Sequence, residues 1–78
     1  MYYTYVLLSK KDKKRYIGYT DNLQKRFHDH QQGKVTVTKN RRPLVIIYYE
    51  ACLSRKKALA REKYFKTGYG RRYLNNRI

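Results

Sequence analysis

The segments YYTYVLL (residues 2–8) and KRYIGYT (residues 14–20) decide the fold of this chain. Both are rich in the aromatic and β-branched residues that strands favour. The first has no charged residue, which is typical of a strand buried on both faces. The lysines and Asp12 between the segments favour a turn, so we expect a hairpin of two strands, 2–8 and 14–19.

A helix is expected after this hairpin. Asp21 can cap its start, with Gln24 at the third helical position, and Gly33 can end it, so the sequence predicts a helix over residues 22–32. The next residues, 34–42, carry several cations and no acid. We therefore expect an exposed basic loop or a sheet edge in that segment.

The most apolar part of the chain begins at Leu44, and we expect residues 44–50 to form the central strand. Ser54 can cap a second helix that runs to about Thr67, and Gly68 and Gly70 are expected to end that helix.

Three strands and two helices predict an α+β fold, in which a small, mostly antiparallel three-stranded sheet is flanked by helices. A chain of 78 residues allows one domain, spanning residues 1–78. Within the basic tail, 71–78, Leu74 and Ile78 are available to pack against this domain.

Charge indicates the class of partner. The chain has 20 Lys and Arg against 5 Asp and Glu, a net charge of +15, which favours a polyanionic partner. Its hydrophobic content of 41% argues against a disordered basic tail. A single cysteine, Cys52, excludes an internal disulfide and a cysteine zinc site, and no stretch approaches the ~20 apolar residues of a membrane span. We expect a cytoplasmic protein that does not bind membranes.

One carboxylate falls among apolar residues on the second predicted helix. At 100° per residue, Glu62 lies in the stripe formed by Ala58, Leu59 and Phe65, so it faces the core side. The alternative is a surface ion pair with Lys66, four residues later. Both interpretations are open at this point.

The first predicted helix repeats this pattern. Leu23 and Phe27 form its thin apolar stripe, and Arg26 and His30 flank the stripe. Each of these two also has a simpler interpretation, Arg26 as a solvated flank and His30 as a half-buried helix residue. His28 falls on the opposite face and is expected to be exposed.

Two short motifs carry a resemblance to a known family. Tyr3-Thr4-Tyr5 on the first strand is followed after ten residues by Tyr16-Ile17-Gly18 on the second, and Arg26 follows eight residues after Gly18. This spacing resembles the GIY-YIG nuclease domain, with Glu62 at the place of that family's helical glutamate. The chain is most similar to the small stand-alone bacterial members, which are grouped with the nuclease domain of a DNA-repair excinuclease.

The match to this family has departures. Tyr3 stands where the family name has glycine, a common variation. His30 resembles the histidine found one turn after the arginine in several branches. Asn75 and Asn76 lie near the place of an asparagine that the family often has, but neither aligns decisively.

The resemblance implies a metal-dependent endonuclease that hydrolyses DNA, with a role in DNA repair or recombination. Glu62 would hold one Mg²⁺ or Mn²⁺ ion, which prefer oxygen ligands. Arg26 would bind a phosphate oxygen, and Tyr16 would be the general base, with His30 able to take or relay the proton. Tyr5 would orient water or substrate.

The cations outside this set suit contacts to the DNA backbone with little sequence specificity. The candidates are Lys39, Arg41, Arg42, Arg55, Lys56, Lys57, Arg71 and Arg72. A second hypothesis is a non-catalytic nucleic-acid-binding module on a nuclease-like scaffold, with tyrosines as stacking surfaces. A third, an adaptor for membrane surfaces or acidic proteins, is weaker because neither helix pairs a broad apolar face with a basic one. The sequence leaves the oligomeric state open.

Overall fold

Three strands form a single sheet in the computed structural model, which describes all residues, 1–78. These strands are β1 (Tyr2–Ser9), β2 (Arg15–Thr20) and β3 (Leu44–Cys52), in the order β2-β1-β3. Both pairings are antiparallel, so the predicted hairpin and the predicted sheet type are confirmed.

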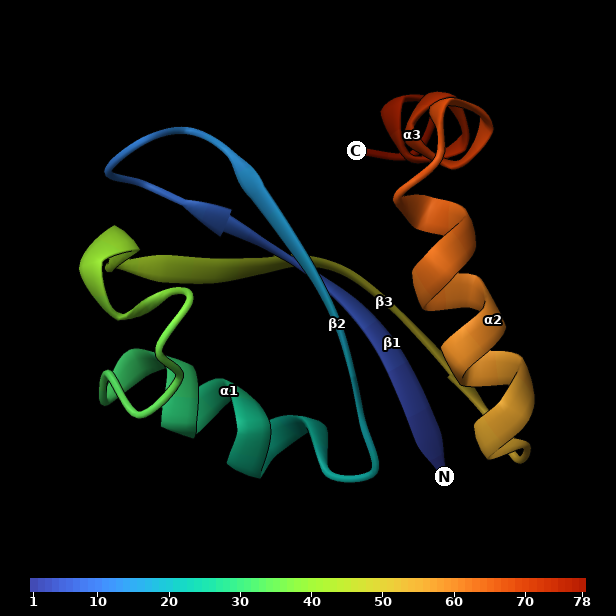
Figure 1. Ribbon diagram of the computed structural model, residues 1–78, viewed down its shortest axis with the longest axis horizontal. Helices are drawn as coiled ribbons and strands as arrows, with labels where there is room; N and C mark the ends of the chain where they lie inside the picture. Colours follow the sequence, from blue (N-terminus) through green and yellow to red (C-terminus); the bar gives the residue numbers. More distant parts are fainter.

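The central strand is β1, and the prediction that residues 44–50 form the central strand is wrong (Figure 1). Four consecutive β1 residues, Thr4 to Leu7, are buried, as expected for a strand covered on both faces. β3 lies at the edge and exposes Tyr49 and Ala51 near its end. Strand hydrophobicity alone did not separate the two positions, because β3 packs apolar side chains against helices on both faces of the sheet.

The helix α1 (Leu23–Gln31) covers one face of the sheet (Figure 1). Its cap is Asn22, whose side chain accepts a hydrogen bond from the Lys25 backbone amide at 3.1 Å, so the predicted Asp21 cap is wrong. Both residues are good caps, and only the backbone conformation decides between them. Gly33 ends this segment as predicted, with a φ of 77° that favours glycine.

The other face is covered by α2 (Arg55–Phe65) and by α3 (Gly68–Asn75), a helix that the sequence did not predict. Ser54 caps α2 as predicted. Gly68 and Gly70 do not simply end α2; they form the first turn of α3, capped by the Thr67 side chain.

α3 packs closely over the end of α2. A Cβ on Gly70 would lie 2.6 Å from the Phe65 Cα, so the approach of the two helices requires glycine there. Leu74 is fully buried, as expected for a docked tail, whereas Ile78 is 43% exposed and does not dock. Leu59 was expected on the inner face of α2 but is 38% exposed.

Each face of the sheet has its own small core. Tyr5, Leu7 and Leu44 form the core on the α1 side. A second core, under α2 and α3, consists of Val6, Phe65 and Leu74. The alternation of side chains along β1 therefore places Tyr5 on the α1 side.

Residues 34–42 are not the simple exposed loop that the sequence predicted. Val35 and Thr38 in this segment are buried, and a short 3-10 helix, η1 (Lys39–Arg41), follows them. The valines and threonines of residues 35–38 alternate with one another between two lysines, and this short run gives no sign of burial in the sequence. No helix of the structure combines the length and the apolar character needed to cross a membrane.

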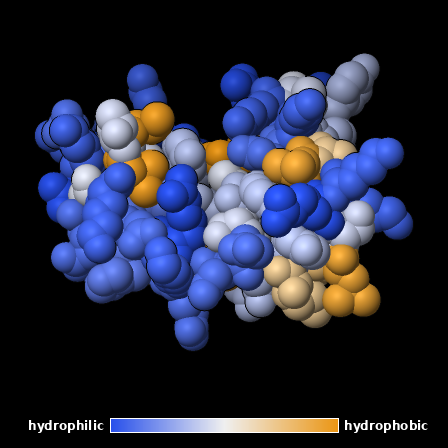
Figure 2. All heavy atoms as spheres, turned by 60° about the horizontal axis from the view of Figure 1, so that its bottom comes forward, coloured by the Kyte–Doolittle hydropathy of each residue, from blue (hydrophilic) through white to orange (hydrophobic).

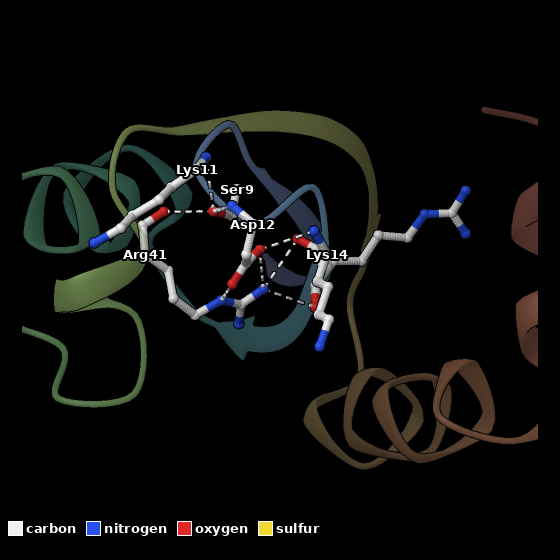
Figure 3. Close-up of polar contacts among 6 residues, drawn as sticks. Ser9, Lys11, Asp12, Lys14 and Arg41 are labelled. Carbon is white, nitrogen blue, oxygen red and sulfur yellow. Dashed lines mark hydrogen bonds and ion pairs between the residues drawn. The ribbon is translucent and has the colours of Figure 1, made fainter.

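Arg41 ties this segment to the β1–β2 turn (Figure 3). Its guanidinium forms an ion pair with Asp12 at 2.7 Å and donates to the Lys14 carbonyl at 3.0 Å. The Ser9 hydroxyl donates to the Arg41 carbonyl at 2.6 Å. Arg41 also holds the pKa of Asp12 at about 2. The predicted turn role of Asp12 is thereby confirmed, with a partner that the sequence did not reveal.

Candidate active site

A buried chain of polar groups crosses from β1 through α1 to the 34–42 segment. The Tyr5 hydroxyl and His30 Nε2 are 2.9 Å apart, and His30 Nδ1 lies 2.7 Å from Thr38 Oγ1. All three side chains are at most 2% exposed. Burial, and next to it the positive charge of Arg26, lower the pKa of His30 to about 4. The imidazole is therefore neutral at pH 7, with one nitrogen donating and the other accepting.

Gly18 leaves the space that the Tyr5 ring occupies. Gly18 on β2 is paired with Tyr5 on β1, and the Tyr5 ring lies over it. A Cβ at position 18 would be 2.5 Å from Tyr5 Cζ, which no real side chain tolerates. The glycine of the YIG motif is thus required by the ring of the tyrosine opposite.

Tyr16 on β2 completes an aromatic group with Tyr5 and His30. Its ring centroid lies 6.5 Å from that of Tyr5 and 5.2 Å from that of His30. Tyr16 is half-buried, and no protein group hydrogen-bonds its hydroxyl. Of the two tyrosines, only Tyr16 therefore presents a hydroxyl that is not already engaged by His30.

Arg26 projects from α1 toward the same group of side chains. Its interaction with the Tyr5 hydroxyl raises the pKa of Arg26. Burial raises the pKa of Tyr5, and Arg26 acts in the opposite direction. Tyr5 is thus a neutral phenol that lies between an arginine and an imidazole. Arg26 and His30 are both brought to the site, as the helical phase suggested, and His28 is exposed as predicted.

Glu62, on α2, acts on this group of side chains through its charge. It lies near enough to Tyr5 that its charge contributes to raising the pKa of that phenol. Its carboxylate is 22% exposed and also lies 3.4 Å from Lys66 Nζ. The surface pair with Lys66 is thus present, and the same carboxylate acts on Tyr5 through its charge. A separation of 3.4 Å between partly exposed groups makes this a weak pair.

The acids of the chain limit which metal site it could build. No group of three or more His, Cys, Asp or Glu side chains could hold an ion. Glu62 is the carboxylate whose charge acts on Tyr5, and its sole side-chain partner is Lys66. Asp29 acts by its charge on His30 and Arg26 and is paired with Lys25. This donor set suits an ion that keeps several waters and takes one carboxylate, as Mg²⁺ does.

The predicted DNA-contacting cations separate into three groups. Arg41 is engaged by Asp12, and the Arg42 guanidinium donates to the Lys39 carbonyl at 2.8 Å, so both have a structural use within the protein. Arg55 and Arg72 lie near tyrosine rings, 5.5 Å from the Tyr2 centroid and 5.8 Å from the Tyr69 centroid. The side chains with neither kind of partner are those of Lys39, Lys56, Lys57 and Arg71.

Sequence reasoning missed Thr38, which holds the second nitrogen of His30. A threonine between hydrophobic and basic residues carries no signal of such a role, because the contact depends on how the loop after α1 folds back. Asn75 is bound by Arg15, whose Nη1 donates to Asn75 Oδ1 at 2.8 Å, and Asn76 makes no side-chain hydrogen bond. Cys52 donates to the Ser54 carbonyl, in line with a packing role.

Comparison with known proteins gives one family. The family model described as the GIY-YIG catalytic domain matches residues 1–75. The chain is 48% identical over 68 residues to the UPF0213 protein of Limosilactobacillus reuteri, a match covering 83% of this chain and 70% of that protein. It is 40% identical over 67 residues to UPF0213 protein SH2523 of Staphylococcus haemolyticus, covering 85% and 80%.

These relatives' names state no activity, and no solved structure matches the chain. The resemblance carried by the two tyrosine motifs is nevertheless confirmed, because the family match extends from the first strand to the end of α3. The three-stranded antiparallel sheet with its helices is consistent with that match. The chain therefore belongs to the GIY-YIG family, whose domain is of nuclease type.

Proposed function

We propose that this protein is a metal-dependent endonuclease that hydrolyses phosphodiester bonds of DNA. One observation carries the proposal: Tyr5, Tyr16, Arg26 and His30 converge on the α1 side of the sheet, and Glu62 borders them from α2. A solvated surface would not bring two tyrosines, a cation and a carboxylate together around a neutral histidine.

Arg26 is suited to hold the scissile phosphate. Its planar guanidinium can bind two phosphate oxygens, and it is partly buried, so its charge is less screened than that of a surface lysine. Within the family-type site it would also stabilise charge that develops on the phosphoryl oxygens.

The two tyrosines have different duties. Tyr5 is buried with its hydroxyl at His30, and the pKa of Tyr5 is raised, so Tyr5 serves to position groups rather than to ionise. Tyr16 has a hydroxyl without a protein partner and is the candidate general base. An unperturbed tyrosine is ionised in only about one molecule in a thousand at pH 7, so this role requires positive charge near its oxygen.

Glu62 would hold one Mg²⁺ or Mn²⁺ ion, through a carboxylate whose only competitor is the weak pair with Lys66. A bound ion of this kind supplies positive charge for the leaving oxygen and the phosphoryl group. His30 would then take part in its neutral form, through the hydrogen bond in which its Nε2 accepts from or donates to the Tyr5 hydroxyl and so fixes the position of that hydroxyl.

The test is a cleavage assay on a panel of labelled DNA substrates: single strand, duplex, flap and four-way junction. Wild type is expected to cut at least one form with Mg²⁺ or Mn²⁺ and none with chelator. Glu62→Gln, which keeps the shape and removes the charge, is expected to lower the rate at least about 100-fold, the scale of losing one charge-stabilising group. Arg26→Lys tests whether the point charge of a lysine can replace the planar guanidinium in binding the phosphate.

Asp21→Asn is the matched control for Glu62→Gln, because Asp21 is exposed and forms no ion pair. It removes one carboxylate of the same chain and is expected to cut at the wild-type rate. If wild type cuts no DNA form, or if Glu62→Gln cuts as fast as Asp21→Asn, the catalytic proposal is wrong. Strong metal-independent DNA binding without cleavage would instead support the non-catalytic binding module.

A further inference from the structure

A groove of about 610 Å³ separates the edge strand β2 from the C-terminal helix α3. Tyr16 lies at one side of it, so the groove adjoins the tyrosine cluster. Five cationic side chains and no acid line it. These cations are Lys13, Lys14, Arg15, Lys66 and Arg71.

The cations of this groove have few partners within the protein. The side chains of Lys13, Lys14 and Arg71 make no hydrogen bond or ion pair. Arg15 donates to the neutral Asn75 amide at 2.8 Å, so its charge is not compensated. Lys66 has only its 3.4 Å contact with Glu62. Five cations held together without acids repel one another, a cost that a bound polyanion would relieve.

A second hollow without acids, beside Pro43, is a poorer candidate. It is lined by Lys11, Lys39 and Arg42, and Arg42 is already bound to backbone carbonyls. None of the candidate catalytic residues lines it. The groove along β2, in contrast, includes Tyr16 and the lysine that pairs with Glu62.

Figure 2 shows the side of the molecule on which the bottom of the Figure 1 view comes forward. Hydrophilic residues cover most of that face, and hydrophobic ones appear in small separate groups. A broad apolar docking surface is not seen there.

We propose that the groove between β2 and α3 binds the sugar–phosphate backbone of the nucleic-acid substrate and directs one strand past Tyr16 to Glu62. The inference rests on the proposed function, because it assumes that the substrate is a nucleic acid. α3 is then one wall of the substrate channel. Lys66 lies where the channel meets the catalytic carboxylate, so it contacts the phosphate nearest to the site.

The consequence is a specific pattern of salt dependence. Each phosphate contact contributes about 0.7 to the slope of log affinity against log salt for a single strand, and about 0.9 for duplex DNA. The double variant Lys14→Gln/Arg71→Gln is therefore expected to lower the slope by about 1.4 for a single strand and by about 1.8 for duplex DNA. The double variant Lys34→Gln/Lys63→Gln is its control, because both lysines are exposed, unpaired and outside the groove.

Binding is measured by fluorescence anisotropy on labelled single-stranded and duplex DNA, in chelator so that no cleavage occurs, over a range of salt concentrations. Thermal melts check that each variant is folded, and the single variants Lys14→Gln and Arg71→Gln are each expected to lose about half of the effect. The expected result is a reduced slope for the groove variant and an unchanged slope for the control.

If the slope falls equally in the two double variants, DNA binding responds to net charge alone, and the proposal that the groove binds DNA is wrong. Absence of DNA binding by wild type would overturn it as well. The proposed function has its own readout, which is DNA cleavage. If the groove variant shows the reduced slope but wild type cuts no DNA, the groove is supported and the endonuclease proposal is refuted.

Discussion

The substitution Gly18→Ala tests how the two tyrosine motifs depend on each other. The backbone at Gly18 has a negative φ, so alanine is conformationally allowed there and the effect comes from contact alone. The added Cβ would lie 2.5 Å from Tyr5 Cζ, far inside an ordinary van der Waals distance. The ring is 1% exposed and packed against Leu7 and Leu44, so it cannot move away freely.

The size of the effect follows from these contacts. Overpacking a filled core costs about 1–3 kcal/mol. Displacing the Tyr5 ring also breaks its 2.9 Å contact with His30 and leaves a buried polar group unpaired, which costs about 1–3 kcal/mol more. Alanine also stabilises the protein by about 0.4–1 kcal/mol relative to glycine, because it lowers the conformational entropy of the unfolded chain. The net loss is about 1–5 kcal/mol, a large part of the stability of a domain this small.

Urea and thermal unfolding measure this loss, since 1 kcal/mol corresponds to about 4–8 °C in Tm for a domain of this size. Gly68→Ala is the control: a Cβ there meets nothing within 4 Å, and the position lies in the first turn of α3. It is expected to leave Tm unchanged or raise it slightly. If Gly18→Ala melts within about 2 °C of wild type, the close approach of Tyr5 to Gly18 is refuted.

The remaining predictions concern the buried histidine. Because the pKa of His30 is lowered to about 4 from 6.5, the unfolded chain binds more protons between these values, and stability is lost as pH falls through that range. The loss is up to about 3 kcal/mol and is expected to vanish in His30→Asn; an equal pH dependence in this variant would contradict it. Thr38→Val leaves His30 Nδ1 without a partner and is expected to cost about 1–3 kcal/mol in urea unfolding, whereas Thr38→Ser retains the hydroxyl and most of the stability. Equal losses in the two variants would show that the hydroxyl does not matter.

Local features of the fold were predictable because local chemistry determines them. The hairpin follows from two β-rich segments around a polar turn, and Ser54 caps α2 because a serine at that position satisfies a free backbone amide. Helical phase singled out the candidate site residues Arg26 and Glu62, because Glu62 lies within an apolar stripe and Arg26 flanks one. Their chemical roles came from the family resemblance and not from phase.

Other features depended on contacts between distant segments. The two glycines after α2 have the composition of a helix end, yet Gly70 permits α3 to approach Phe65 closely, which sequence spacing does not reveal. Arg41 resembled a free DNA-binding cation until its pairing with Asp12, 29 positions away, was seen. Thr38 has no sequence signal at all.

The sequence by itself determined that this chain forms an α+β domain with a large positive charge and carries two tyrosine motifs, an arginine and a glutamate at family-like spacing. Composition is counted directly from the chain, and helical or strand periodicity involves residues only a few positions apart, so both can be read from the sequence. The tertiary structure alone decided that β1 is central, that His30 is buried and neutral between Tyr5 and Thr38, and which cations keep their charges uncompensated. Those properties arise from burial and pairing between segments far apart in the chain, and no local pattern encodes them.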